Sequence, residues 1–293
     1  MKKVLPILLV IAVVAVALFF VLSKNNPTGA AGLNFEMKFK PGEIDKYKMT
    51  MDMTMNMPNM PRAAAAASSN TQMNMTMLMT METLSVNPDG SAKVKYKISD
   101  MKMNMPGVLG GLRTMPDVEL TATMSKDGKT SNVEGMSNVP GMAMSGVDMN
   151  KMMSNFSGIM LPGKPIRIGE TWEGQMPSAL GGNLATQFRL DSDNQPIGSA
   201  KAAKITSTFS YKGTLADLMK QVGKASALPS GMNGNVDISG TGTTYFDPAA
   251  GKTLKTDADI VEKMDMQLPT GAAPGAPQNM QMNMTMKMHM EKI

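Results

Sequence analysis

The sequence predicts a mainly β protein: a curved antiparallel sheet or half-barrel of about ten strands, with two amphipathic helices and an N-terminal transmembrane helix. Two observations carry this prediction. From residue 35 onward, apolar side chains recur at every second position, which is the spacing of a half-buried strand. Residues 4–22 form an unbroken apolar run behind Lys2 and Lys3, and a helix of about 19 such residues is long enough to cross the core of a bilayer.

The N-terminal run is long for a cleavable signal, which has an apolar region of about 7–15 residues and then a small-residue cleavage site. Here the run ends in Ser23 and Lys24 without such a site. We therefore interpret residues 1–26 as a signal anchor, residues 27–34 as a linker and residues 35–293 as an extracytoplasmic β-rich domain on a single-pass cell-membrane protein. Cleavage, which would make the domain a secreted protein, stays open as the alternative.

The composition limits the chemistry that the chain can perform. It contains 36 methionines among 293 residues, no cysteine and one histidine. The lack of cysteine excludes disulfide scaffolds, cysteine-ligated zinc and thiol catalysis. One histidine also removes most histidine-based catalysis. We therefore expect a protein that is not an enzyme and has no cofactor.

The charge of the chain does not indicate a nucleic-acid partner. The formal net charge is +5, from 29 basic and 24 acidic residues. Lys2, Lys3 and Lys24 flank the apolar run, so 26 basic residues face 24 acidic ones in the rest of the chain. The lysines are scattered among acids and hydroxyls and form no basic stripe. We expect the membrane, through the N-terminal helix, and an apolar small molecule or lipid as partners.

The period-two pattern places about ten strands along the exported part. The expected strands lie near residues 35–39, 47–57, 73–81, 94–105, 118–124, 184–190, 203–211, 236–246, 254–268 and 280–290. In the fourth of these the apolar phase slips by one residue without a break. Such a slip predicts a β-bulge near Ser99 and Asp100.

Two segments follow helical spacing instead. Residues 149–160 place apolar side chains on one helical face, and Thr214 with Asp217 forms a capping box before a run that includes Leu215 and Leu218. Two low-complexity inserts, residues 61–69 and 269–277, are predicted to be hairpin tips.

Methionine at every second position is the strongest candidate feature. The simplest interpretation is structural, because methionine can replace leucine or isoleucine on the core face of a strand. Methionine is also common on adaptable surfaces that accept varied apolar ligands. We expect part of this face to be open and to bind an apolar ligand through Met49, Met51, Met53, Met55, Met75, Met77, Met79 and Trp172.

Cu(I) binding is the alternative, because thioethers are soft ligands that select this ion. The candidate ligands are Met282, Met284, Met286, Met288 and His289. Alternate residues of one strand are nearly 7 Å apart, so sulfurs that share an ion must come from neighbouring strands or a kink. His289 falls in the polar phase of its strand.

Three short motifs resemble a family of uncharacterised bacterial exported proteins. They are a Gly-Glu start at residues 42–47, a Pro-rich segment ending in Gly-Glu-Thr-Trp at residues 161–173, and a Phe-Asp turn at residues 246–251. The resemblance spans most of residues 35–293 and implies a curved sheet similar to the half-barrels of lipoprotein-carrier (LolA-like) proteins, with no catalytic residue. We therefore expect a membrane-tethered envelope protein that binds an apolar ligand, with a purely structural surface protein as a further alternative.

Overall fold

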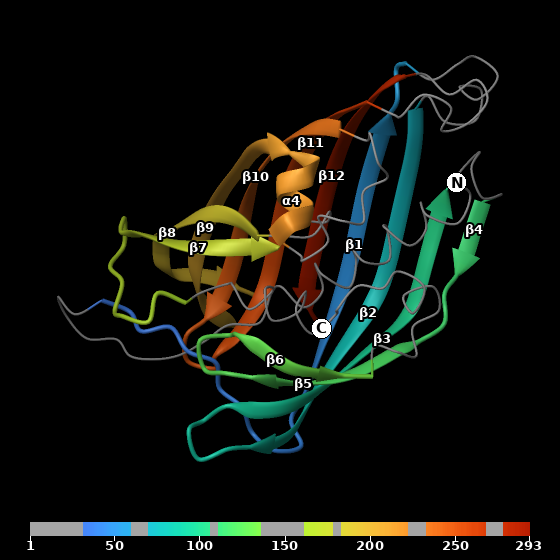
Figure 1. The fold of residues 1–293 in the computed structure, drawn as a ribbon. Helices are drawn as coiled ribbons and strands as arrows, with labels where there is room; N and C mark the ends of the chain where they lie inside the picture. Colours follow the sequence, from blue (N-terminus) through green and yellow to red (C-terminus); the bar gives the residue numbers. More distant parts are fainter. Residues whose placement is uncertain are drawn as a thin grey trace.

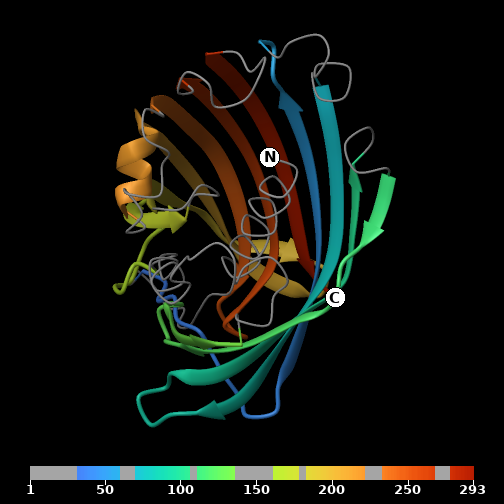
Figure 2. The same ribbon diagram turned by 45° about the vertical axis from the view of Figure 1, so that its right-hand side comes forward.

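The described part of the chain forms one large antiparallel β-sheet. The computed structural model describes residues 32–59, 70–105, 111–135, 161–177, 183–221, 233–267 and 278–293. The sheet has twelve strands: eleven hydrogen-bond in the order β6-β5-β3-β2-β1-β12-β11-β10-β9-β8-β7, and β4 pairs with β3 beside this path. The sheet is strongly curved, and β6 and β7 lie at its two ends without pairing to each other (Figures 1 and 2). The prediction of a mainly β fold with a curved antiparallel sheet is confirmed.

The first half of the described chain supplies six strands. Their bounds are β1 Ile44–Asn56, β2 Asn70–Val86, β3 Ala92–Met105, β4 Gly111–Thr114, β5 Val118–Met124 and β6 Thr130–Glu134.

The second half supplies six more strands and one helix. Their bounds are β7 Thr171–Pro177, β8 Asn183–Ile197, β9 Ala200–Thr214, α4 Leu215–Gln221, β10 Asn233–Asp247, β11 Lys252–Gln267 and β12 Asn279–Lys292. Because β12 pairs with β1, the last strand joins the two halves into a single sheet. Most neighbours in the sheet are also neighbours in sequence, as expected for strands joined by hairpins.

The first predicted strand is wrong. Phe35 and Met37 are buried at alternate positions, as the pattern suggested, but residues 34–40 form no strand. This segment is an extended chain that lies on the core, where the Met37 amide donates to the carbonyl of Lys126 at 2.7 Å. Leu33 forms an isolated bridge with Ile166. In this segment, side chains alternate between buried and partly exposed although the backbone does not pair with a neighbouring strand.

One of the two predicted helices is present. Thr214 caps α4, because its Oγ1 accepts a hydrogen bond from the amide of Asp217 at 3.0 Å. Leu215 and Leu218 of α4 are buried, and the helix lies against β9 and β10 (Figure 1). The other predicted helix, residues 149–160, lies outside the described residues, as do residues 4–22 and both inserts. Among the described residues, no helix has the length and apolar character to span a bilayer.

The predicted β-bulge is confirmed. The register between β2 and β3 shifts where Thr76 faces Lys102 and Leu78 faces Ser99, so Asp100 and Met101 together oppose Met77. Asp100 has a φ of 50°, in the left-handed region that aspartate tolerates better than most residues. Met101 and Met103 are buried beyond the bulge. The extra residue therefore keeps both halves of β3 directed toward the core.

Candidate functional site: the Met-lined face

Methionines from neighbouring strands stand opposite one another on one face of the sheet. In the centre, Met51 of β1 pairs with Met288 of β12 on one side and with Met75 of β2 on the other. The same arrangement recurs in three rows, which we name the Met rows: Met290–Met49–Met77, Met288–Met51–Met75 and Met286–Met53–Met73. Met55 faces Met284 at the next position. Residues opposed in this way have Cβ atoms about 4.5–5.5 Å apart, which is closer than alternate residues of one strand.

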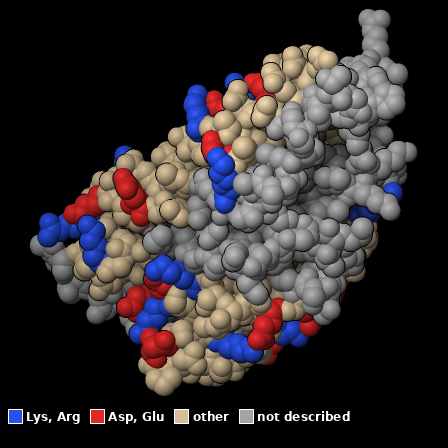
Figure 3. Space-filling view, in the orientation of Figure 1, with Lys and Arg blue, Asp and Glu red and all other residues tan. Residues whose placement is uncertain are grey.

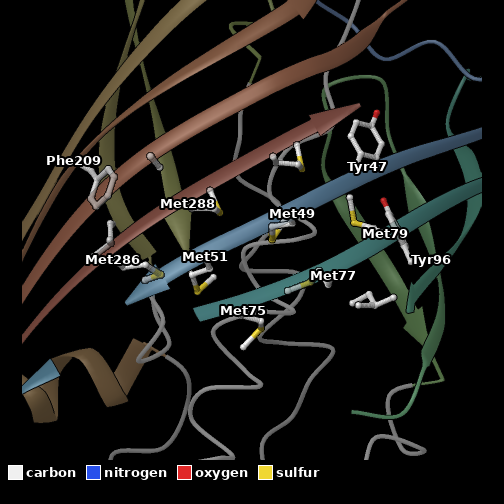
Figure 4. Packing of buried hydrophobic residues seen from close by; sticks show 14 of the residues in the cluster. Tyr47, Met49, Met51, Met75, Met77, Met79, Tyr96, Phe209, Met286 and Met288 are labelled. Atoms are coloured by element: carbon white, nitrogen blue, oxygen red, sulfur yellow. The ribbon is translucent and has the colours of Figure 1, made fainter. Parts of the chain in front are cut away.

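The side chains of the Met rows are buried. Figure 4 shows Met49 and Met51 of β1 beside Met75, Met77 and Met79 of β2 and Met286 and Met288 of β12. The exposed fraction is at most 5% for each of Met49, Met51, Met53, Met55, Met75, Met77 and Met79. These seven methionines are therefore not an open part of the face, and ligand binding by them stays a prediction. They belong to one hydrophobic cluster, whose thioethers can fill irregular space.

Trp172 lies at another place on the sheet. It belongs to β7 at the end of the sheet, five strands away from β12 in the pairing order. Its ring stacks on Phe188 at 5.5 Å and on Phe35 at 6.2 Å between centroids. Strand pairing therefore does not bring Trp172 to the Met rows, although it belongs to the same hydrophobic cluster.

The alternative metal ligands are divided between two faces. Met284, Met286 and Met288 are buried, whereas His289 faces the opposite side and places Nδ1 2.7 Å from Oδ1 of Asp257. His289 and the methionines therefore form no common site. Among the described residues, no group of three or more His, Cys, Asp or Glu side chains is arranged to hold a metal ion.

Two buried tyrosines lie beside the Met rows at one end. Tyr47 and Tyr96 are fully buried, and burial raises the pKa of both phenols. The hydroxyl of Tyr96 lies 3.8 Å from the sulfur of Met124, while that of Tyr47 has no hydrogen-bond partner. Both phenols are therefore neutral at ordinary pH.

The face becomes accessible at the opposite end. Burial of the methionines decreases along β12. Met290 is fully buried and Met284 is 8% exposed, whereas Met282 and Met280 are half-buried. Beyond them lies a cavity of about 560 Å³, lined by both apolar and polar side chains. Its lining includes Met266, Met280 and Asp265.

Glu262 lies on the same face and was missed in the sequence analysis. It stands opposite Met284 on β12 and Ile238 on β10 and is 2% exposed. Its Oε1 has no hydrogen-bond partner. Burial raises the pKa of the Glu262 carboxyl from its ordinary value of 4.5 to about 7. The signal was present in the sequence, because Glu262 occupies the apolar phase between Ile260 and Met264.

A second group of buried charges lies at the far end of the face. Lys252, 2% exposed, contacts Asp45 at 2.5 Å and Glu43 at 2.9 Å. Lys292 contacts the other oxygen of Asp45 at 2.6 Å. These charges neutralise one another, so they serve to hold β1, β11 and β12 together rather than to receive a ligand.

The outer surface carries charges of both signs. Among the described residues visible in Figure 3, basic and acidic side chains are interspersed. Pairs such as Lys95 with Glu119 at 2.7 Å and Lys97 with Asp117 at 2.8 Å connect neighbouring strands. Such exposed pairs contribute little stability, about 0–1 kcal/mol each.

Comparison with known proteins gives only distant similarities. No family model matches the chain, and no curated protein matches it. Among solved structures, DynF from the dynemicin biosynthesis pathway of Micromonospora chersina aligns over 91% of this chain and 88% of its own, with 13% identity and a TM-score of 0.21. An outer membrane channel from Pseudomonas putida F1 aligns over 92% and 100%, with 9% identity and a TM-score of 0.28. OmpF of Salmonella typhi in complex with daunomycin aligns over 88% and 100%, with 8% identity and a TM-score of 0.24. Similarities this low carry no argument about the function of this chain.

Proposed function

We propose that this chain is a non-enzymatic envelope protein, tethered to the membrane by residues 4–22, that binds an apolar ligand against its Met-lined face. The observation that carries the proposal is the arrangement of the Met rows, beyond which β12 continues to the half-buried Met282 and Met280 beside a cavity of about 560 Å³. Flexible thioethers adapt to ligands of different shape better than branched side chains do.

The buried rows support a path for such a ligand. It meets Met266 and Met280 at the cavity, and the next inward pair on the same two strands is Met264 with Met282. Met55, Met53, Met51 and Met49 continue the apolar wall on β1, and Met75, Met77 and Met79 continue it on β2. A ligand therefore enters at the cavity and displaces unbranched side chains, which change rotamer at little cost.

Ligand binding is tested with the full-length protein in lipid nanodiscs and the neutral fluorescent probe N-phenyl-1-naphthylamine. We expect saturable fluorescence above that of empty nanodiscs. Met282→Gln, which makes the accessible end polar at nearly constant volume, weakens it. Thr285→Gln, on the exposed outer phase of the same strand, leaves it unchanged. Fluorescence no greater than that of empty nanodiscs contradicts the proposal and favours a purely structural surface protein.

Location is tested separately. We expect the full-length protein in the membrane fraction, with residues 35–293 digested when protease is added to spheroplasts. A soluble cytoplasmic product contradicts the membrane tether, and a shortened exported product shows that the N-terminal segment is cleaved.

Cu(I) binding is the second candidate function. Methionines of the Met rows are better candidate ligands for it than the residues of β12 alone. Met51, Met75 and Met288 come from three neighbouring strands. Opposed residues of neighbouring strands lie closer together than alternate residues of one strand. If the face serves apolar contacts, the protein takes up less than one Cu(I) per chain in competition with a chelator such as bicinchoninate. Stoichiometric uptake that is lost in Met51→Leu/Met75→Leu/Met288→Leu, but kept in Met37→Leu/Met115→Leu/Met124→Leu, establishes the metal function instead.

A further inference from the structure

Glu262 is a carboxylic acid placed in an apolar surface, and its Oε1 has no hydrogen-bond partner in the described part of the chain. Ile238 and Met284 stand opposite it, and Ile260 and Met264 precede and follow it on the inward phase of β11. The four diagonal positions carry valine, glycine and two methionines. A buried polar group that lacks a hydrogen bond costs free energy, so a leucine at this position would stabilise the fold.

Charged groups on β10, β11 and β12 do not compensate for this cost. The inward positions of β10 carry no charge, and those of β11 and β12 carry only Lys252 and Lys292 besides Glu262. Lys252 lies ten residues along β11, on the order of 30 Å away at the rise of a strand, and contacts Asp45 and Glu43. Lys292 is engaged by Asp45 as well. Glu262 therefore has no cation of its own among the described residues.

The cavity at the end of the face also carries a negative charge. Asp265 is the charged residue among the described residues that line it. Glu262 lies four residues inward from Met266, about 13 Å along the strand, with Met264 and Met282 between them. Asp265 lies in the exposed phase of β11, so Glu262 is the carboxylate on the inward phase, with Met264 and Met282 between it and the cavity.

We infer that the ligand of the Met-lined face is an amphipathic organic cation, with an apolar body that lies on the methionines and a positive group that pairs with the carboxylate of Glu262. This inference rests on the proposed function and names its ligand class. A buried carboxylate without a partner is unfavourable, and a cation that pairs with it offsets this cost. Protonation of Glu262 removes this preference, and its pKa of about 7 makes binding depend on pH near neutrality.

The test uses three probes with the same tail and different head charges: octylammonium, octanol and octanoate. Each is titrated by calorimetry into the full-length protein in lipid nanodiscs at pH 8, with empty nanodiscs as the reference. We expect octylammonium to bind at least tenfold more tightly than octanol, and octanoate to bind most weakly. Octylammonium binding weakens as the pH falls from 8 to 6.

Two variants assign the effect to Glu262. Glu262→Gln weakens octylammonium binding at least tenfold, leaves octanol binding within about twofold and removes the dependence on pH. Glu262→Leu gives the same loss with an apolar side chain that suits the site. The matched control is Asp259→Asn, which removes a charge from the exposed phase of the same strand and leaves all three affinities unchanged.

The outcomes separate the inference from the proposed function. If octanol binds but octylammonium binds no more tightly, or if Glu262→Gln leaves octylammonium binding unchanged, the cation inference is wrong while apolar-ligand binding stands. If no probe binds above empty nanodiscs, the proposed function and the inference both fail.

Discussion

The ammonium of Lys252, at the start of β11, lies 2.5 Å from Oδ2 of Asp45, at the start of β1. The two residues are separated by 207 positions in sequence, and both are almost fully buried. Lys292 at the end of β12 reaches the second oxygen of the same carboxylate. Asp45 therefore connects the three strands where the N-terminal and C-terminal parts of the sheet meet.

Loss of the Asp45 carboxylate is expected to destabilise the sheet. Asp45→Asn leaves the buried ammonium of Lys252 with Glu43 alone, and breaking a buried pair by removing one partner costs about 3–5 kcal/mol. Because Glu43 remains, we expect the free energy of unfolding to fall by about 3 kcal/mol, at the lower end of this range. Chemical denaturation of the full-length protein in mild detergent measures it.

The control for Asp45 is an exposed pair on the same sheet. Asp259 lies 3.6 Å from Lys287, and both side chains are more than half exposed. Asp259→Asn should change the free energy of unfolding by less than about 0.5 kcal/mol. Equal effects of the two substitutions would show that the buried group around Asp45 has no special role in stability.

The faces of the strands could be predicted from the sequence, because side chains alternate with a period of two. The pattern correctly placed Met49 to Met55 on the buried face and His289 on the other. The phase slip near Asp100 predicted the bulge for the same reason. Phe35 and Met37 show the limit of this signal, since an extended segment that lies on a core gives the same alternation without pairing.

The pairing of distant strands could not be predicted in this way. Nothing in the local pattern shows that β1 lies beside β12, so neither the Met rows nor the contact between Asp45 and Lys252 could be derived from the sequence. The accessible end of the face depends on the same pairing. Glu262 differs, because its position in the apolar phase of its strand was visible and only its lack of a partner required the structure.

The bulge makes Asp100 sensitive to the shape of the side chain. Its φ of 50° costs a β-branched residue about 1–2 kcal/mol relative to glycine. We expect Asp100→Val to lower the free energy of unfolding by about this amount and Asp100→Gly to leave it unchanged or raise it slightly. Ser99→Val, at the neighbouring strand position, should have little effect. A harmless Asp100→Val would mean that the bulge forms elsewhere.

The raised pKa of Glu262 makes stability depend on pH with a defined sign. Between about pH 4.5 and pH 7 the folded chain keeps a proton that the unfolded chain releases. The free energy of unfolding therefore falls as the pH rises through this window, and the contribution of Glu262 levels off above it. At about 1.4 kcal/mol for each pH unit, the total loss is about 3 kcal/mol. Denaturation curves at pH 5 and pH 8 measure this loss.

Comparison with a neutral side chain isolates this contribution from other titrating groups. Glu262→Gln has no carboxyl to ionise, so the variant should be more stable than the wild type at pH 8, and the difference should shrink toward pH 5. If the two proteins show the same dependence on pH, the Glu262 carboxyl ionises in the folded chain as readily as in the unfolded one. The carboxyl is then not buried in the folded protein.

Oxidation with dilute hydrogen peroxide distinguishes the accessible end of the Met-lined face from its buried part. Peroxide converts methionine to a polar sulfoxide at a rate that follows exposure of the sulfur. Met266 and Met282 are half-buried beside the cavity, whereas Met49 and Met79 are fully buried. In the folded full-length protein we expect the first two to oxidise at least tenfold faster than the second two, as measured by peptide mapping.

Saturating octylammonium should protect Met266 and Met282 if the ligand passes over them. If Met49 and Met79 react as fast as Met282 while the circular dichroism spectrum stays native, the inner rows are open to solvent, and a ligand can reach them without entering at the cavity.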